Sequence, residues 1–179
     1  MHQYDYVIVG AGSAGSALAS RLSESGKFTV CLLEAGGSDK KFWVQMPLGY
    51  GKVFHDPSVN WRYMTEPEPN LDNQSVYWPR GKVLGGSSSI NAMVWVRGHK
   101  RDYEEWASVA PGWDWNNVQK IFNRIENWDG TSDVSRGMNG PQAVHDVSSD
   151  VHPLTISYLE AASQIGIKTN ADYNGRSEE

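Results

Sequence analysis

The chain has 179 residues, of which 16 are Lys or Arg and 21 are Asp or Glu, so its formal charge is −5. This acidic balance argues against a broad basic surface of the kind that binds nucleic acids. A content of 39% hydrophobic and 21% charged residues is typical of a globular protein. The single cysteine excludes an intrachain disulfide and a cluster of thiolate ligands.

The sequence carries no signal for export or for a membrane. No apolar run approaches the roughly 18 residues of a transmembrane helix. Residues 1–5 lack the basic and then apolar order of a signal peptide. We therefore expect a cytoplasmic protein without a transmembrane segment.

The N-terminal part predicts a strand, a helix and a second strand. Residues 4–9 are a short β-prone run, residues 16–23 have apolar side chains at helical spacing, and residues 28–33 form a second apolar run. Ser25-Gly26-Lys27 ends the helix. This order is a βαβ unit, and it predicts a Rossmann-like α/β domain.

Residues 36–83 differ from this N-terminal part, because prolines interrupt every run of residues that has the apolar spacing of a helix or a strand. We expect long loops there, with short strands over 61–64 and 76–78. A long irregular stretch inside a compact domain is typical of a segment that binds or covers a ligand.

The remaining chain predicts mainly helices. Residues 85–95 are a helix or a turn, and further helices are expected over 100–109, 116–127 and 153–164. Residues 130–140 form a polar loop. Trp106 and Trp113 or Trp115 are expected to anchor the core and loops rather than to stack on a cofactor.

Gly10, Gly12 and Gly15 have the order G-x-G-x-x-G between the first strand and the helix. In such a turn the first glycine allows the tight bend, the second lets a diphosphate approach the backbone, and the third lets helix and strand pack closely. The N–H groups of Ser13 to Gly15 and the helix dipole favour negative charge there.

Glu34 lies 19 residues after Gly15, at the end of the second predicted strand. Its carboxylate can accept a hydrogen bond from a ribose 2′-hydroxyl and repels a 2′-phosphate. The motif therefore predicts a dinucleotide and disfavours NADP. The motif does not distinguish FAD from NAD, because both cofactors contain an ADP half.

A second glycine set lies within residues 79–91, whose sequence is PRGKVLGGSSSIN. Two adjacent glycines let a ligand approach the backbone, and the serines can cap a helix and present N–H donors. Such donors can stabilise negative charge on a reduced flavin. A Ser-capped helix after a turn explains the pattern equally well, so the residues alone leave both interpretations open.

The two glycine sets together resemble the glucose-methanol-choline (GMC) flavoprotein oxidoreductases. Residues 81–104 are similar to the first signature of that family, and they follow its glycine motif and its Glu-Ala-Gly sequence at residues 34–36. Met46-Pro47-Leu48-Gly49 and Asn60-Trp61 are most similar to the bacterial alcohol and choline dehydrogenase branch. The resemblance covers essentially the whole chain.

The resemblance implies that the cofactor is FAD, and it assigns the contacts. The diphosphate would be held by Gly10, Gly12, Ser13, Ala14 and Gly15, the adenosine ribose by Glu34, and the adenine edge by Ala35 and Gly36. The loop along the diphosphate and ribityl chain would comprise Arg80, Gly81, Val83, Leu84, Gly85, Gly86 and Ser87. Asn91, Ala92, Met93 and Val94 would lie beside the isoalloxazine. Trp61 would pack near the cofactor, with a core position as an alternative.

In some family members a histidine immediately before this asparagine attaches FAD covalently. The corresponding position here is Ile90, which has no nucleophilic atom. We therefore expect the FAD to be non-covalent.

The resemblance also implies a reaction: an alcohol is oxidised to an aldehyde or ketone by hydride transfer to flavin, which an unidentified acceptor reoxidises. The catalytic histidine of the family lies near the end of a much longer chain, so no catalytic residue is assigned here. We expect residues 1–179 to be the N-terminal part of the FAD-binding domain, with residues 36–83 covering the cofactor. The rest of that domain and the substrate domain would come from the C-terminal part of the protein, without which this chain is expected to be inactive.

Two alternatives stay open: an NAD-linked Rossmann dehydrogenase, and a GMC-like flavoprotein with lyase or light-driven chemistry. Membrane association through the electron acceptor is also open. The other reactive side chains suggest no rival site. His99 is expected to be a surface residue at a helix start, and Cys31 to be packed and inert in an apolar strand. No spacing of His, Asp or Glu indicates a metal site.

Overall fold

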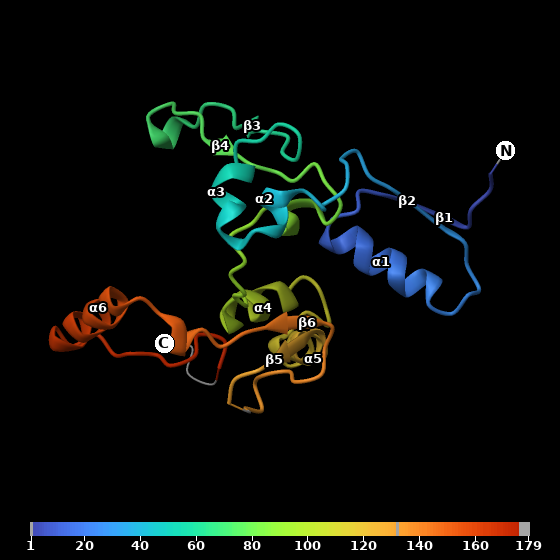
Figure 1. Ribbon diagram of the computed structural model, residues 1–179. Coiled ribbons are helices and arrows are strands. Elements are labelled where there is room, and N and C mark those ends of the chain that lie inside the picture. The colour runs from blue at the N-terminus through green and yellow to red at the C-terminus, as the bar shows by residue number, and fades with distance from the viewer. Residues whose placement is uncertain (1, 132, 176–179) are drawn as a thin grey trace. The chain divides into compact units, whose positions relative to one another are not determined.

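The computed structural model describes residues 2–131 and 133–175. The chain divides into two compact units, Met1–Val94 (unit 1) and Trp95–Glu179 (unit 2). Both contain helices and strands, in agreement with the α/β prediction. In Figure 1 the ribbon runs from blue to green through unit 1.

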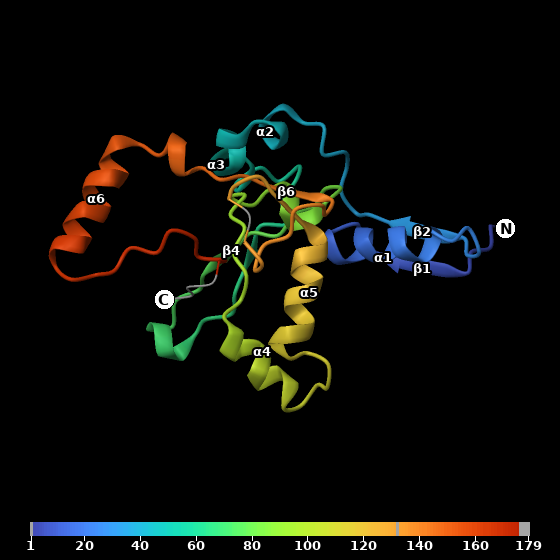
Figure 2. The ribbon, with the colours of Figure 1, turned by 90° about the horizontal axis from the view of Figure 1, so that it is seen from below.

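Unit 1 begins with the predicted βαβ unit. Strands β1 (Tyr6–Val9) and β2 (Val30–Leu33) pair in parallel, and helix α1 (Ser13–Ser23) connects them. Figures 1 and 2 both show α1 lying along the strand pair. The helix starts earlier than predicted because Gly12 serves as its N-cap.

The parallel pair leaves apolar surface uncovered. Val7 is 58% exposed and Val9 is 85% exposed. Parallel sheets are normally covered on both faces. The strand pair therefore has the character of part of a larger sheet.

The segment 36–83 contains short helices that the sequence did not predict. They are α2 (Phe42–Gln45), η1 (Pro47–Gly49), α3 (Tyr50–Val53) and η2 (Pro69–Leu71). The prediction of long loops was wrong at these positions. At η1 and η2 the reason is that proline, with its fixed φ, starts a 3₁₀ turn rather than preventing it. The predicted short strands are confirmed as β3 (Tyr63–Met64) and β4 (Tyr77–Trp78), which pair antiparallel.

The core of unit 1 is a cluster of Val53, Val59, Val83 and Ile90. Residues 85–95 contribute Ile90 to it, and they form one 3₁₀ turn, η3 (Gly86–Ser89), rather than a longer helix. The turn stops because Ile90 leaves the helical conformation, with a φ of −128°.

Unit 2 confirms the three further helices: α4 (Lys100–Ala107), α5 (Trp115–Ile125) and α6 (Pro153–Gln164). The helix expected over 116–127 was predicted too long, since the chain becomes extended at Glu126 and forms β5 (Glu126–Trp128). β5 pairs in parallel with β6 (Gln142–Val144), and η4 (Ser148–Asp150) follows. Within the described residues, no helix is long and apolar enough to cross a membrane.

Aromatic rings join α4 to α5. Trp106 lies edge-on to Tyr103 and Trp113, and Tyr103 also contacts Trp115 and Phe122. These tryptophans therefore anchor helices and the loop between them, as predicted, but Trp106 and Trp113 are 53% and 50% exposed, so the prediction of a core position was wrong for these two.

Candidate functional site

The first glycine loop has the backbone geometry that its spacing predicts. Gly10 has a φ of +96°, which L side chains rarely adopt, and its N–H donates to the Leu33 carbonyl oxygen at 2.7 Å. A Cβ on Gly15 would lie 1.9 Å from the Gly10 oxygen and 3.3 Å from Ile8 Cγ2. A side chain at position 15 would thus force α1 away from β1.

The N-terminus of α1 is not capped by a side chain. No side chain caps the helix at Gly12, and its first turn contains no acidic residue. The first N–H groups of a helix have no partner inside the helix, and the helix dipole is positive there. Ser13 and Ala14 begin the helix at this point, as the sequence predicted.

The second glycine loop lies directly against the first. The Gly85 N–H donates to the Ala11 carbonyl oxygen at 2.8 Å. A Cβ on Gly86 would lie 2.8 Å from Gly12 Cα, so the two backbones are in contact. The structure therefore joins two motifs that lie far apart in the sequence.

The chain before Gly85 is held by the same kind of contact. A Cβ on Gly81 would lie 2.2 Å from the Gly86 carbonyl carbon, and the Gly81 N–H donates to Ser87 Oγ at 3.1 Å. A Cβ on Gly36 would lie 2.0 Å from the Lys82 carbonyl carbon. The Leu84 N–H donates to the Gly37 oxygen at 2.9 Å. Segments 10–15, 34–37 and 80–87 thus form one surface built on backbone.

Glu34 connects two of these segments. Its Oε2 accepts from the Ala11 N–H at 2.8 Å, and its Oε1 accepts from the Gly36 N–H at 2.9 Å. Each carboxylate oxygen retains a second lone pair. Glu34 can therefore hold the loops in place and still accept a hydrogen bond from a ligand hydroxyl.

The comparisons with known proteins agree with this geometry. The sequence matches the family model of GMC oxidoreductases over residues 4–179. The chain belongs to the GMC oxidoreductase family. It is 47% identical, over 99% of its length, to oxygen-dependent choline dehydrogenase from Rhizobium etli, of which it covers 32%. It therefore spans about a third of the length of the curated relatives it matches.

Solved structures give the same result for the fold. Pyridoxine 4-oxidase from Mesorbium loti matches with a TM-score of 0.89 and 33% identity, over 97% of this chain and 34% of that one. An FAD-dependent oxidoreductase from Chaetomium thermophilum matches with a TM-score of 0.77 and 30% identity, over 92% of this chain and 30% of that one. This GMC chain therefore has the α/β fold of one part of these longer enzymes.

Not every predicted site residue lies at the glycine loops. Val83 is fully buried in the core, so only its backbone can face a ligand. The guanidinium of Arg80 lies over the Trp78 ring, 5.0 Å from its centroid, and donates to the Pro79 oxygen. Asn91 accepts from the Met93 N–H at 2.9 Å, and no hydrogen bond of the described residues joins the predicted Asn91–Val94 segment to the first glycine loop.

Trp61 lies at an open hollow of about 470 Å³ in unit 1. Its ring stacks on Tyr63 at 5.9 Å, and the ammonium of Lys82 lies 4.5 Å from its centroid. At 42% exposure Trp61 is not in the core, so the alternative of a core position was wrong. Its contact with a cofactor stays a prediction.

Sequence reasoning missed Asn60, which fixes the start of the second loop. Asn60 is 2% exposed, and its Oδ1 accepts from the Arg80 N–H at 3.0 Å and from the Arg62 N–H at 2.9 Å. Its Nδ2 donates to the Phe54 oxygen at 2.8 Å. The Asn60-Trp61 pair was the available signal, but nothing in its spacing revealed the side-chain role.

Of the other reactive residues, His99 lies at a helix start as predicted, whereas Cys31 is less buried than the predicted packed thiol. His99 is the N-cap of α4, in a capping box with Asp102. Cys31 lies in β2 and is half-buried. In the part of the chain that the structure describes, no three His, Cys, Asp or Glu residues are placed to hold a metal ion.

Proposed function

We propose that this chain binds the ADP portion and part of the flavin of FAD in an enzyme that oxidises an alcohol to an aldehyde or ketone. The observation that carries the proposal is the backbone contact between the two glycine loops at Gly12 and Gly86. It brings the diphosphate motif and the GMC signature into one surface.

The residues present fit this cofactor. At Gly15, Gly36, Gly81 and Gly86 an added Cβ would lie less than 3 Å from neighbouring backbone, so the loops pack without intervening side chains. The uncapped N-terminus of α1 suits a diphosphate. The spare lone pairs of Glu34 suit the ribose hydroxyls. These groups therefore suit the diphosphate and the ribose of an ADP moiety.

Bound FAD would supply the hydride acceptor. The residues of this chain would hold it: the glycine loops fix the diphosphate, and Glu34 fixes the ribose. N–H donors near Ser87 would favour negative charge at the pyrimidine edge of the flavin. The base that takes the hydroxyl proton is proposed to come from the C-terminal part of the protein.

FAD is favoured over NAD because the related structures include an FAD-dependent oxidoreductase at 30% identity. Non-covalent attachment is favoured because the Ile90 side chain is 3% exposed and packs in the core of unit 1. The relative from Rhizobium etli is named for choline. We propose an alcohol as the substrate class, without choosing among alcohols.

The test is anaerobic mixing of the whole protein that contains this chain with short, long-chain, aromatic and amino alcohols. Bleaching of the visible flavin band by at least one alcohol is the expected result. A protein that lacks flavin and turns over an alcohol with NAD would overturn the proposal. A flavin band that no alcohol bleaches would favour lyase or light-driven chemistry instead.

Two further expectations remain proposals. The enzyme is proposed to act in the cytoplasm, and a separate electron acceptor is proposed to reoxidise the flavin. Membrane association would arise through that acceptor. Flavin content in the supernatant and membrane fractions of lysed cells tests the location, and reoxidation of the reduced flavin in the presence and absence of added acceptors tests the second proposal.

A further inference from the structure

The hollow beside Trp61 in unit 1 is large enough for a small molecule. Its volume of about 470 Å³ lies within the range of about 300–1,000 Å³ that is usual for small-molecule sites. Its lining includes the charged side chains of Arg62 and Lys82 and the apolar side chains of Pro57 and Met64. It therefore has room for a molecule that carries both a charge and an apolar part.

Backbone contacts join the two segments that line this hollow. The Lys82 N–H donates to the Val59 oxygen at 2.7 Å, and Asn60 pairs antiparallel with Gly81. The buried Asn60 side chain also accepts from the Arg62 N–H at 2.9 Å. This contact holds Arg62 at a φ of +57°, which is uncommon for a residue other than glycine. The side chains of Arg62 and Lys82 therefore start from positions that are fixed relative to one another.

Arg62 and Lys82 bring two positive charges to the hollow. The Lys82 ammonium lies 4.5 Å from the centroid of the Trp61 ring, and such a cation–π contact leaves the charge in place. Among the described residues, no carboxylate forms an ion pair with Arg62 or Lys82. Both cations are therefore free to contact an anion.

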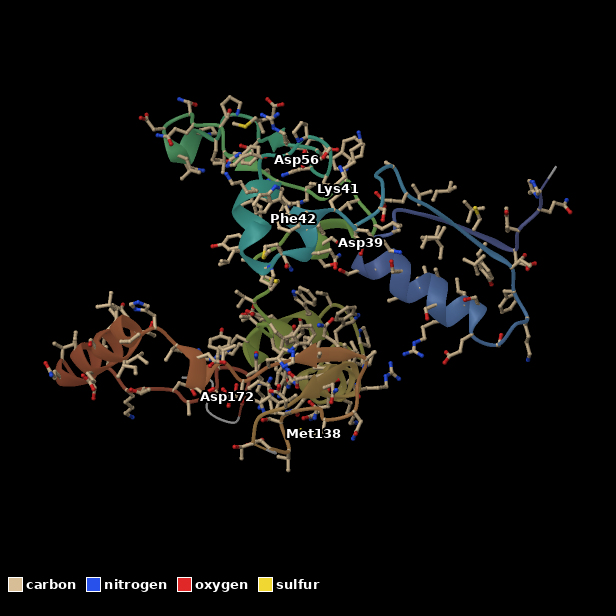
Figure 3. All side chains as sticks on the ribbon, in the orientation of Figure 1. Asp39, Lys41, Phe42, Asp56, Met138 and Asp172 are labelled. Atoms are coloured by element: carbon tan, nitrogen blue, oxygen red, sulfur yellow. The ribbon has the colours of Figure 1, made fainter. Side chains whose placement is uncertain are left out.

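The negative charge of Asp56, which precedes Pro57 in the chain, is offset elsewhere. Its Oδ1 accepts from the Ser58 N–H at 2.8 Å and from the Ser58 hydroxyl at 2.6 Å. The Lys41 ammonium donates to the same hydroxyl at 2.6 Å, and Figure 3 shows Lys41 and Asp56 close together. Asp56 is thus balanced by Lys41, and the charge of the hollow stays positive.

We propose that this hollow binds a small organic anion. Its carboxylate or phosphate group would contact Arg62 and Lys82, which are donors suited to an oxyanion, and its apolar part would lie against Pro57 and Met64. Aromatic rings can also attract a quaternary ammonium, but here the Lys82 ammonium already lies against Trp61. The site therefore selects by charge, and this selection does not depend on whether the protein oxidises an alcohol.

The test is a calorimetric titration of the purified whole protein with benzoate, phenyl phosphate and benzamide. Low ionic strength is used because salt screens charges in an open site. At least one of the two anions is expected to bind at least about 10-fold more tightly than benzamide, which has the ring of benzoate without its charge. Which anion binds more tightly shows whether the site takes a carboxylate or a phosphate. Choline is not expected to displace the bound anion.

Two variants assign the binding to this hollow. Arg62→Gln and Lys82→Gln each remove one positive charge, and each is expected to weaken anion binding about 10-fold. Lys27→Gln is the matched control, because Lys27 is exposed between α1 and β2 and does not line the hollow. It should bind the anion as the wild type does.

Arg62→Gln decides the matter if Lys82→Gln, whose substitution lies in the second glycine loop, loses its flavin. The inference is wrong if both variants bind the anion as tightly as Lys27→Gln, or if the anions bind no more tightly than benzamide. A wild-type protein that binds the anion but contains no flavin would contradict the proposed function alone.

Discussion

In unit 1 the glycine contacts between backbone segments lie beside a helix N-terminus that no side chain caps, whereas in unit 2 the most deeply buried contacts join charged side chains. Unit 2 also has close glycine contacts, at Gly137 and Gly140. Gly86 touches Gly12, and Gly15 touches Gly10, with no side chain between the segments. In unit 2, by contrast, Glu126 lies between Arg97 and Arg136. The first arrangement leaves an uncapped helix N-terminus beside the loops. The second pairs charged side chains with one another, although the buried Nε of Arg97 has no hydrogen-bond partner among the described residues.

The two kinds of contact suit different purposes, ligand binding in unit 1 and stability of the fold in unit 2. A surface made of backbone brings N–H groups close to a ligand and tolerates no added side chain. A buried ionic cluster costs free energy to desolvate, and it holds only while its partners are complete. We therefore expect substitutions in unit 1 to act on cofactor binding and substitutions in the cluster to act on folding.

Gly15→Val is expected to have the largest effect on the cofactor. Its Cβ would lie 1.9 Å from the Gly10 oxygen, so helix and strand must separate. The whole protein should be isolated without stoichiometric FAD, as measured by the ratio of flavin to protein absorbance. Gly51→Val is the control, because a Cβ there meets nothing within 4 Å. Stoichiometric FAD in the Gly15→Val variant would contradict the role in FAD binding that is assigned to the first glycine motif.

Glu126→Gln is expected to have the largest effect on stability. Burial lowers the pKa of Arg97 and the Glu126 carboxylate opposes that shift, so the neutral variant leaves both guanidiniums without their shared counter-charge. A loss of about 3–5 kcal/mol in the free energy of unfolding should follow. Denaturant unfolding followed by tryptophan fluorescence measures it.

Glu104→Gln, on the exposed side of α4, is the matched control and should change the unfolding free energy by less than about 0.5 kcal/mol. The folded fraction of Glu126→Gln should retain FAD. Equal stability of the two variants would show that the cluster does not hold unit 2 together.

Glu34→Ala should weaken FAD binding by about 1–3 kcal/mol, because a charge-assisted hydrogen bond is lost. The variant also frees the Ala11 and Gly36 N–H groups that the carboxylate now binds. Glu34→Gln, which keeps one acceptor oxygen, should lie between the wild type and Glu34→Ala. Titration of FAD into the apoprotein gives the three affinities, and identical values would rule out a contact with the ribose.

The smallest effect is expected at Asp129, at the end of β5. A hydrogen bond with the His145 ring and one from the Asp146 N–H lower the pKa of Asp129 below its usual value of 3.8. Because the folded pKa is the lower one, the ionised carboxylate stabilises unit 2 above about pH 4, and this contribution disappears as the pH falls through the lowered pKa.

Asp129→Asn should therefore lower the melting temperature slightly near neutral pH and have no effect in strong acid. The shift is small because both side chains are exposed. Melting curves of wild type and variant over a series of acidic pH values test this. A difference that grows toward acid would have the wrong sign.

The sequence predicts most of unit 1 because its signals are local. A strand, a glycine turn and a helix in immediate succession determine their own geometry, and Glu34 follows at a fixed spacing. The contact between Gly12 and Gly86 is not local, and only the family resemblance anticipated it. The turn over residues 47–49 was missed because proline can start a short turn as well as interrupt one.

Unit 2 was harder to predict for a different reason. An ion pair between residues as distant as Arg97 and Glu126 leaves no periodic pattern in the sequence. The end of α5 was misplaced for this reason, since Glu126 resembles an ordinary helix residue until its two arginine partners are known. Asn60 escaped notice in the same way, because its role depends on which backbone groups the fold brings to it.

The central claim is that segments 10–15 and 80–87 together bind FAD without a covalent bond. The most direct measurement is to denature the purified whole protein, filter it, and identify the flavin in each fraction. The account predicts stoichiometric FAD in the filtrate and none in the precipitated protein. A protein that releases no FAD, and that binds NAD in its place, would contradict it.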